Sequence, residues 1–237
     1  MWALIHVGIA IIHCSMTRTS VGGVPIRRVG QHPYPWVYEA DLAASQSGSI
    51  TRHDPLSSCF WPAATALASL ISRWRWDGQR CLELGCGTGL CSLTAATMGA
   101  ASVMATDVSL VSLQLTQAAA ADQRLNVSVA EFDVLSNAAL ITADVLILSD
   151  LFVTEDLARA HARRVHEAMC AGFETILVVD PGRSTRAVFT SRLEEYFGSS
   201  APKLSFEDAD SCLQRLKRNE QLVLLNSQVG APISYDI

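Results

Sequence analysis

Charged residues are scarce in this sequence, and its positive charge is nowhere concentrated. Of the 237 residues 17% are charged, the formal net charge is −5, and no segment is dense in lysine or arginine. Proteins that bind duplex nucleic acid neutralise phosphates with such basic segments. The composition therefore argues against a nucleic-acid partner. The 49% hydrophobic content instead predicts a globular chain with a large core.

Two further absences limit the class of protein. The seven cysteines include no Cys-x-x-Cys pair, and an odd number without that pattern favours a reducing compartment over a disulfide framework. We expect no metal site, because Cys81, Cys86 and Cys91 would fall on a strand, a loop and a helix. The apolar run Trp2–Cys14 is shorter than the about 20 residues that a membrane-spanning helix needs, so we expect no membrane partner.

The N-terminal segment contains no acidic residue before Glu39, whereas Arg18 stands among serines and threonines. Such composition partly matches a mitochondrial transit peptide. The alternative is a leader segment without a targeting function on a cytoplasmic protein. We expect residues 1–53 to form an N-terminal leader or extension. Residues 54–237 are then long enough for one sizeable α/β domain, which we expect to be a monomer.

The segment Arg80–Leu90 reads as a buried strand, a glycine-rich turn and the start of a helix. Its glycines stand at alternate positions: Gly85, Gly87 and Gly89. Such a turn allows backbone N–H groups and a helix N-terminus to approach a ligand closely. The spacing is not the dinucleotide fingerprint, because Leu90 occupies the sixth position. Glu83 would repel a pyrophosphate, so it suits a ligand that carries an ammonium group.

This segment resembles motif I of the seven-strand S-adenosylmethionine-dependent methyltransferases, whose glycine loop passes the methionyl end of the cofactor. The resemblance implies a doubly wound, Rossmann-like α/β sheet of seven strands with an antiparallel last strand. It also implies S-adenosylmethionine as the cofactor. The motif residues that the resemblance places beside it are Glu83, Gly85, Cys86, Gly87 and Gly89.

Trp61 precedes Pro62, which is well suited to the first turn of a helix. This pair looks like the tryptophan-containing entry of the protein-lysine methyltransferase branch, where the indole borders the cofactor. The alternative is that Trp61 is an anchor of the core.

Two further acids end predicted strands. Asp107 follows Gly85 by about 20 residues, the separation at which an α/β unit delivers an acid to a ribose diol. Capping of the next helix is the alternative for Asp107. Asp133 and Val134 stand where the resembling family holds the adenine, and Glu131 is a rival for the contact with the adenine amine.

Asp150 ends the near-continuous apolar run 143–149, which predicts a central strand covered on both faces. Chemistry in open α/β sheets takes place beyond the carboxyl ends of the strands. Asp150 is therefore the candidate catalytic acid.

The segments Ser149–Ala158 and Val179–Arg183 resemble paired signatures of the electron-transfer-flavoprotein β-subunit lysine methyltransferases and related bacterial proteins. The resemblance covers roughly residues 54–197. It implies a lysine-bearing protein as the substrate and places Ser149 beside the cofactor. In one respect the sequence departs from the family, because Val153 stands where the motif has Tyr or Phe to wall the target amine.

A lysine amine with a pKa of about 10.4 arrives protonated, so Asp150 would orient the ammonium while the proton leaves to water. The leading function is thus protein-lysine methylation that depends on S-adenosylmethionine. The alternatives are a small-molecule amine N-methyltransferase and a non-catalytic cofactor-binding protein, for which Val153 is the motivating residue.

The C-terminal part reads as strand, helix and strand, over Lys203–Phe206, Ser211–Arg218 and Gln221–Gln228. We expect these strands to supply the antiparallel final pair of the sheet.

Overall fold

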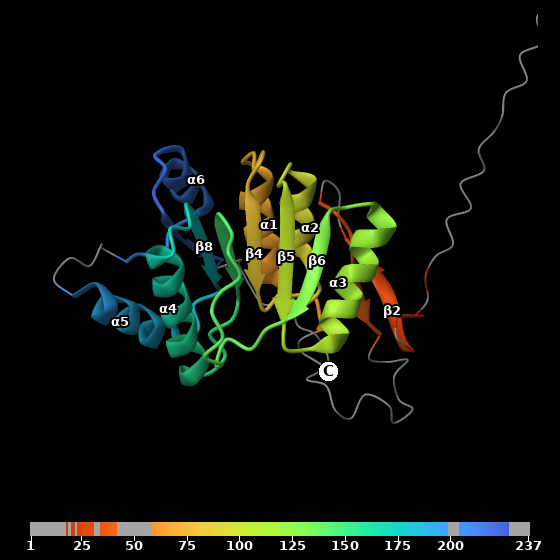
Figure 1. Cartoon of the computed structure of the whole chain (residues 1–237), viewed down its shortest axis with the longest axis horizontal. Coiled ribbons are helices and arrows are strands. Elements are labelled where there is room, and N and C mark those ends of the chain that lie inside the picture. Colours follow the sequence, from red (N-terminus) through yellow and green to blue (C-terminus); the bar gives the residue numbers. More distant parts are fainter. Residues whose placement is uncertain are drawn as a thin grey trace, which may run out of the picture.

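A six-stranded parallel sheet forms the centre of the computed structural model, which describes residues 18, 20–21, 23–30, 34–41, 58–198 and 204–227 (Figure 1). The strands lie in the order β6-β5-β4-β7-β8-β9. Their bounds are β4 Arg80–Leu84, β5 Ser102–Asp107, β6 Val127–Glu131, β7 Val145–Ser149, β8 Thr175–Asp180 and β9 Leu222–Asn226. All five neighbouring pairs are parallel, so the carboxyl ends meet at one edge of the sheet.

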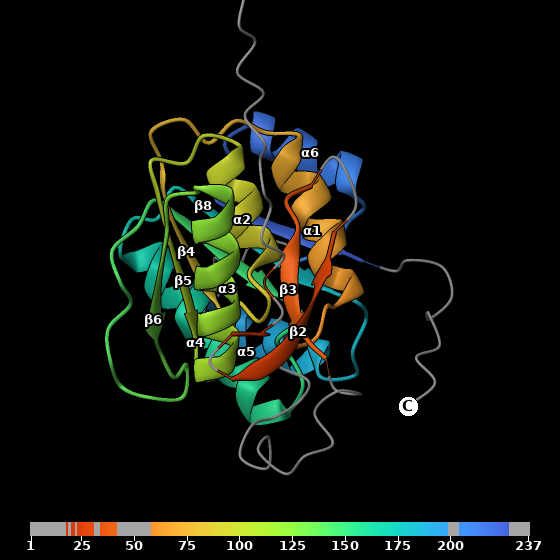
Figure 2. The same cartoon turned by 90° about the vertical axis from the view of Figure 1, so that its right-hand side faces the viewer.

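Helices cover both faces of the sheet, as a doubly wound fold requires (Figures 1 and 2). One face carries α1 Pro62–Ser72, α2 Leu90–Thr97, α3 Leu110–Gln123 and α6 Ala209–Lys217. The other face carries α4 Glu155–Cys170 and α5 Arg186–Phe197. Side chains alternate between the two faces along each strand. Ile147 therefore packs in the core beneath α1, α2 and α6, whereas Leu146 packs in the core beneath α4 and α5. The predicted α/β class is confirmed.

The expected antiparallel last strand is wrong for the described residues. β9 pairs in parallel with β8. In the expected strand Lys203–Phe206, the described residues 204–206 form no strand, and a parallel bridge joins the next residue, Glu207, to Leu225. The reason is α6, which was predicted correctly. A helix between two strands returns the chain to its starting end, so the second strand runs parallel to the first, whereas an antiparallel pair needs a short turn.

A second, antiparallel sheet packs against α3. It consists of β1 Ser20–Val21, β2 Val24–Val29 and β3 Val37–Ala40. Val37 and Tyr38 are buried with the apolar face of α3. The Tyr38 hydroxyl donates to Asp122 at 2.9 Å, and the Gln123 amide donates to the Trp36 carbonyl at 2.8 Å. This part of the predicted extension therefore has strands that the sequence analysis did not anticipate, and the boundary at residue 53 stays a prediction.

The run Trp2–Cys14 lies outside the described residues, so the expectation of a cytoplasmic or mitochondrial location stays a prediction. Among the helices that the structure describes, none combines the length and the apolar character needed to cross a bilayer.

Removing residues 1–53 should destabilise the protein, because β3 leaves the face of α3. Two buried side chains, Val37 and Tyr38, are each worth about 1.5–3 kcal/mol, so the free energy of unfolding should fall by about 3 kcal/mol or more. Urea melts measure this change. A variant lacking only residues 1–15 should retain its transition. An unchanged melt of the longer deletion would show that β1–β3 contribute nothing to the stability of the domain.

Candidate functional site

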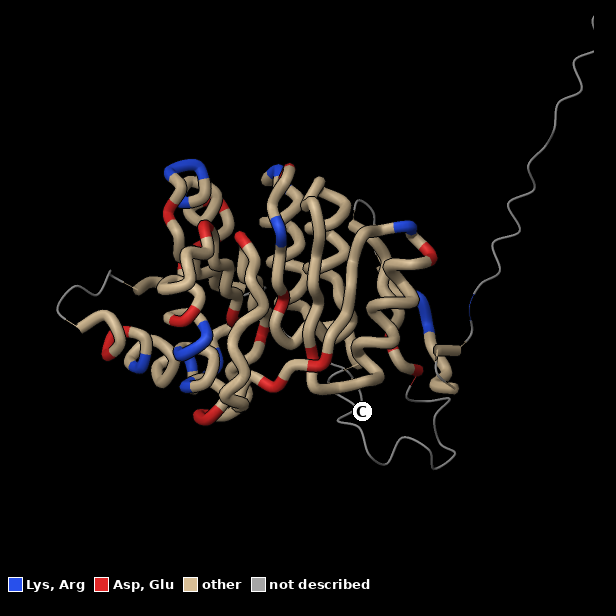
Figure 3. Tube along the Cα trace, in the orientation of Figure 1, with Lys and Arg blue, Asp and Glu red and all other residues tan. Residues whose placement is uncertain are grey.

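A cavity of about 350 Å³ opens at the carboxyl ends of the strands, and its volume falls within the usual range of ligand pockets. Figure 3 shows acidic positions along the carboxyl ends of the strands, which lie toward the bottom of that view. The predicted residues that line the cavity are Trp61, Gly85, Gly87, Asp107, Asp133, Val134, Ser149 and Asp150. Val153, which the sequence analysis placed beside the target amine, also lines it. The lining residues that the sequence analysis did not predict are Val108, Phe132, Leu135, Leu151, Leu157, His161 and Arg183.

The glycine loop follows β4 and presents backbone to the cavity. Gly85 has a φ of 63°, in the region that favours glycine. A Cβ atom on Gly85 would lie 2.5 Å from Cδ2 of Leu151, which lines the cavity itself. A side chain at this position would therefore displace a wall of the cavity. The close approach of this backbone to a ligand stays a prediction, and Gly85 lines the cavity in which it would occur.

Asp107 ties the glycine loop to the end of β5. Its Oδ2 accepts a hydrogen bond from the Gly87 N–H at 2.9 Å, and its Oδ1 accepts from the Ser109 N–H at 2.8 Å. The cap of α3 is instead Ser109, whose hydroxyl accepts from the Ser112 N–H. The capping alternative for Asp107 is therefore wrong, and its contact with a ribose stays a prediction.

Glu83 does not line the cavity, which corrects the expectation that it faces the ligand. Strand alternation turns its side chain toward α2, and it accepts hydrogen bonds from the backbone N–H and the hydroxyl of Ser92. Burial raises the pKa of Glu83 to about 8, against the hydrogen bonds from Ser92 that lower it. The carboxyl is thus largely neutral at pH 7 and is a poor partner for a ligand ammonium.

Cys86 and Gly89 also lie outside the cavity lining, behind the loop. The Cys86 sulfur is 3.8 Å from the Thr116 hydroxyl of α3. Gly89 has a φ of 79°, and a Cβ atom there would lie 2.5 Å from Thr116. Both positions therefore support the loop from the side of α3.

The loop after β6 forms the next wall. Asp133 is exposed, and its Oδ1 accepts from the Leu135 N–H at 2.8 Å. The Val134 carbonyl accepts from Arg163 at 2.9 Å and from the buried Arg164 at 3.2 Å. Asp133 and Val134 line the cavity, whereas the rival Glu131 does not. The sequence analysis missed these two arginines, because α4 meets this loop only after folding.

Asp150 lies beside the cavity with its side chain buried and its backbone in a strained conformation. Its φ is 58°, which is uncommon for a residue with a side chain, and such strain concentrates at functional sites. Its Oδ1 accepts from Nε of Arg183 at 2.6 Å. Burial raises the pKa of Asp150, and the hydrogen bond and charge of Arg183 oppose that rise.

Arg183 is the functional candidate that sequence reasoning missed, although the turn that carries it was noted. The Gly182 and Arg183 N–H groups donate to Oδ1 of the buried Asp180, at 2.8 and 3.1 Å. Asp180 also accepts from Arg186 at 2.6 Å. The turn after β8 is thereby fixed, and it holds Arg183 against Asp150.

The wall of the cavity at position 153 lacks the aromatic side chain that the resembling family has there. Val153 lines the cavity with 56% of its surface exposed. Phe152 does not replace the aromatic, because it is buried and stacks on Phe189 with ring centroids 4.3 Å apart.

Two buried polar atoms beside the cavity have no hydrogen-bond partner in the described part of the chain: the Ser149 hydroxyl and Nε2 of His161. Nδ1 of His161 lies 2.7 Å from the Leu157 carbonyl oxygen, which assigns its proton to Nδ1 and leaves Nε2 an acceptor. Burial lowers the pKa of His161 to about 4, so the ring stays neutral.

Comparisons with known proteins identify the domain. Residues 81–172 match the family model described as a methyltransferase domain. This segment is a methyltransferase domain. The family expected from the glycine motif, the S-adenosylmethionine-dependent methyltransferases, is confirmed.

The methyltransferase domain has curated relatives and a structural neighbour. The electron transfer flavoprotein beta subunit lysine methyltransferase of Rattus norvegicus is 30% identical over 140 residues, 55% of this chain and 52% of the relative. The Homo sapiens protein of the same name is 27% identical over 136 residues, 55% of this chain and 50% of the relative. The chain thus spans about half the length of the curated relatives it matches.

Among solved structures, the Pyrococcus abyssi tRNA (uracil-54, C5)-methyltransferase in complex with S-adenosyl-L-homocysteine aligns with a TM-score of 0.50 and 15% identity. The alignment covers 71% of this chain and 38% of that one, and it supports the fold alone.

The residues of the methyltransferase cavity fit S-adenosylmethionine. The glycine loop leaves room for backbone contacts, and the carboxylates of Asp107 and Asp133 are acceptors for hydroxyl and amine donors. Phe132 and Leu135 offer apolar surface for a purine ring.

The raised pKa of Glu83 predicts a pH-dependent stability. The folded carboxyl has a pKa of about 8 against an ordinary value of 4.5, so between these values the folded chain binds more protons than the unfolded one. The free energy of unfolding should therefore fall as the pH rises from about 4.5 to about 8. Glu83→Gln should lack this fall.

Urea melts from pH 5 to about 9 give the comparison, with Glu131→Gln at the exposed end of β6 as the matched control. Parallel pH profiles of wild type and Glu83→Gln would contradict the neutral buried carboxyl.

Proposed function

We propose that the protein transfers the methyl group of S-adenosylmethionine to the side-chain amine of a lysine in a protein substrate. The observation that carries the proposal is Asp150, a buried carboxylate beside the predicted cofactor cavity. An acid in this place suits a cationic substrate group. The curated relatives support the choice of lysine, since each is named as a lysine methyltransferase.

The cofactor, when bound, would supply a methyl group on a positively charged sulfur; a neutral amine nitrogen would attack the methyl carbon in line while the sulfur leaves with the bonding electron pair as a neutral thioether. A lysine amine enters as an ammonium, because its pKa is about 10.4. The Asp150 carboxylate accepts a charge-assisted hydrogen bond from that ammonium and so fixes its direction. A carboxylate is too weak a base to hold the proton, so the proton leaves to water and Asp150 acts by positioning.

Arg183 prepares Asp150 for this role. Burial alone favours the protonated carboxyl, and the guanidinium at 2.6 Å stabilises the charged form. The same contact fixes the direction of the carboxylate before a substrate arrives. Asp107, by contrast, lies beside the loop and is proposed to hold the ribose, which changes little during the reaction.

Val153 motivates the rival function, a cofactor-binding protein without catalysis. An exposed valine gives the target amine less of a wall than the aromatic of the resembling family. Methyl transfer to a small-molecule amine is the other rival, and one experiment distinguishes all three.

The experiment incubates the protein with cell lysate and S-adenosylmethionine labelled in its methyl group, then separates proteins from small molecules. Label should appear in proteins, as methyl-lysine after hydrolysis. Asp150→Asn should lower the rate by about a hundredfold while cofactor affinity stays within a few-fold. Asp107→Ala should instead weaken cofactor binding by about 1–3 kcal/mol, measured by calorimetry.

A melting curve of each variant separates these effects from unfolding. Label confined to small molecules supports the small-amine function, and cofactor binding without any transfer supports the non-catalytic one. Near-normal transfer by a folded Asp150→Asn protein would remove Asp150 from the catalytic site.

A further inference from the structure

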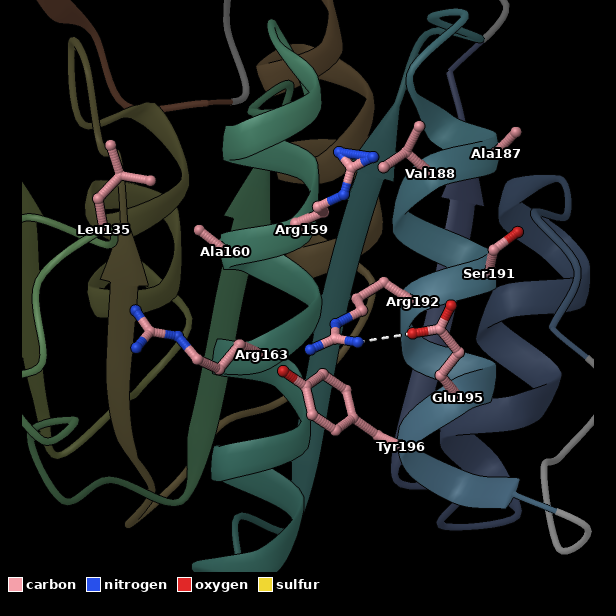
Figure 4. A pocket seen from close by; sticks show the side chains of 10 residues that line it. All are labelled: Leu135, Arg159, Ala160, Arg163, Ala187, Val188, Ser191, Arg192, Glu195 and Tyr196. Carbon is pink, nitrogen blue, oxygen red and sulfur yellow. Dashed lines mark hydrogen bonds and ion pairs between the residues drawn. The ribbon is translucent and has the colours of Figure 1, made fainter.

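A groove of about 720 Å³ runs between α4 and α5, on the outer side of the helix layer (Figure 4). The facing helices contribute small residues to its floor, among them Ala160, Ala187 and Ser191. Val188 and the ring of Tyr196 add apolar surface. The groove is larger than the cavity beneath the glycine loop and has room for several residues of an extended or helical segment.

The groove is continuous with the proposed methyl-transfer site through Leu135. This side chain is 53% exposed and lines both the groove and the cavity. Figure 4 shows Arg159 and Val188 near the end of the groove toward which the strands point, and Tyr196 toward the opposite end. A segment lying in the groove therefore leads to the edge where Asp150 lies.

Positive charge exceeds negative charge in the groove, although the whole chain has a net charge of −5. Its lining contains Arg159, Arg163 and Arg192 but only Glu195 as an acid. Figure 3 shows basic positions on α4 and α5 with acidic positions between them. The excess of arginine attracts carboxylates, which planar guanidinium groups bind in pairs of hydrogen bonds.

The groove arginines are available to a partner. Arg163 donates to the backbone carbonyls of Val134 and Ser136, and no carboxylate of the described residues forms an ion pair with it. Arg159 pairs with Glu155 at 2.9 Å and Arg192 with Glu195 at 2.6 Å, both at the surface. Such exposed pairs contribute at most about 1 kcal/mol, so they exchange readily for an incoming carboxylate.

We propose that this groove docks an acidic segment of the protein substrate and thereby directs a lysine of the same protein to Asp150. The proposal rests on the proposed function. Recognition of acidic motifs by arginine clusters is a recurring mode of peptide binding. The apolar floor seats the segment, and the arginines select its charge and speed its approach.

Direct binding tests the docking surface without cofactor or methyl transfer. The probe is a fluorescein-labelled peptide of Ala-Glu-Glu repeats, compared with an Ala-Lys-Lys peptide of the same length by fluorescence anisotropy. The acidic peptide should bind the full chain, with an affinity that falls as salt rises. The double variant Arg159→Glu/Arg192→Glu should weaken binding by about tenfold or more, because attraction at both sites becomes repulsion.

Three further variants make the test specific. Arg159→Lys/Arg192→Lys should retain most of the affinity, because the charge remains. Ser191→Trp should weaken binding by filling the groove without a change of charge. Arg73→Glu is the matched control, since Arg73 is exposed and paired with Asp210 in the same way at the end of α1, and it should bind as wild type does.

Equal binding of the two peptides would overturn the docking surface. Binding of the acidic peptide that is equal for wild type, Arg159→Glu/Arg192→Glu and Ser191→Trp would also overturn it. Tighter binding of an oligouridylate than of the acidic peptide would also overturn it, in favour of a nucleic-acid surface. Peptide binding that persists while lysate assays show no methyl transfer would refute the proposed function and leave the groove a binding site for acidic peptides.

Discussion

The two backbone hydrogen bonds accepted by Asp107 hold the candidate site together. One carboxylate oxygen takes the Gly87 N–H and the other takes the Ser109 N–H, so the loops after β4 and β5 are fixed to each other. Because the strands are parallel and adjacent, both loops emerge at the same edge of the sheet. The cavity lies between these loops, where Gly85 and Gly87 line it with backbone alone.

A second pair of loops depends on ion pairs between buried carboxylates and partly exposed arginines. Asp180 is fully buried, fixes the turn after β8 through Gly182 and Arg183, and is paired with Arg186. That turn delivers Arg183 to Asp150, whose backbone is itself bonded to Val179. Removing one partner of a buried pair is costly, because the other charge stays buried without compensation. Strand ends and charge pairs thus place the strained Asp150 beside the cavity.

Local patterns predicted what depends on neighbours in the sequence. The glycine spacing marks the loop at Gly85, and apolar runs that end in acids mark β5 and β7 with Asp107 and Asp150. Each of these signals lies within one strand and the turn after it, where backbone geometry depends mainly on local residues.

Features that arise from packing were not predictable in this way. Glu83 lies in a strand whose alternation directs its side chain toward α2. There it accepts a hydrogen bond from Ser92 instead of facing a ligand, and this contact arises only when α2 packs on the strand. Arg183 meets Asp150 through the pairing of β7 with β8, and β1–β3 become recognisable once α3 offers them an apolar face. The parallel direction of β9 follows from α6. The sequence analysis predicted α6 but took an antiparallel last strand from the resemblance to the methyltransferases.

The central claim is that S-adenosylmethionine chemistry takes place at this edge of the sheet, and hydrogen–deuterium exchange with S-adenosylhomocysteine tests it most directly. The account predicts slower exchange of backbone amides in the glycine loop around Gly85 and in the loop that follows Asp133, with α6 unchanged. A nicotinamide dinucleotide should leave all of them unchanged. Unaltered exchange in the glycine loop, or equal protection by the dinucleotide, would contradict the account.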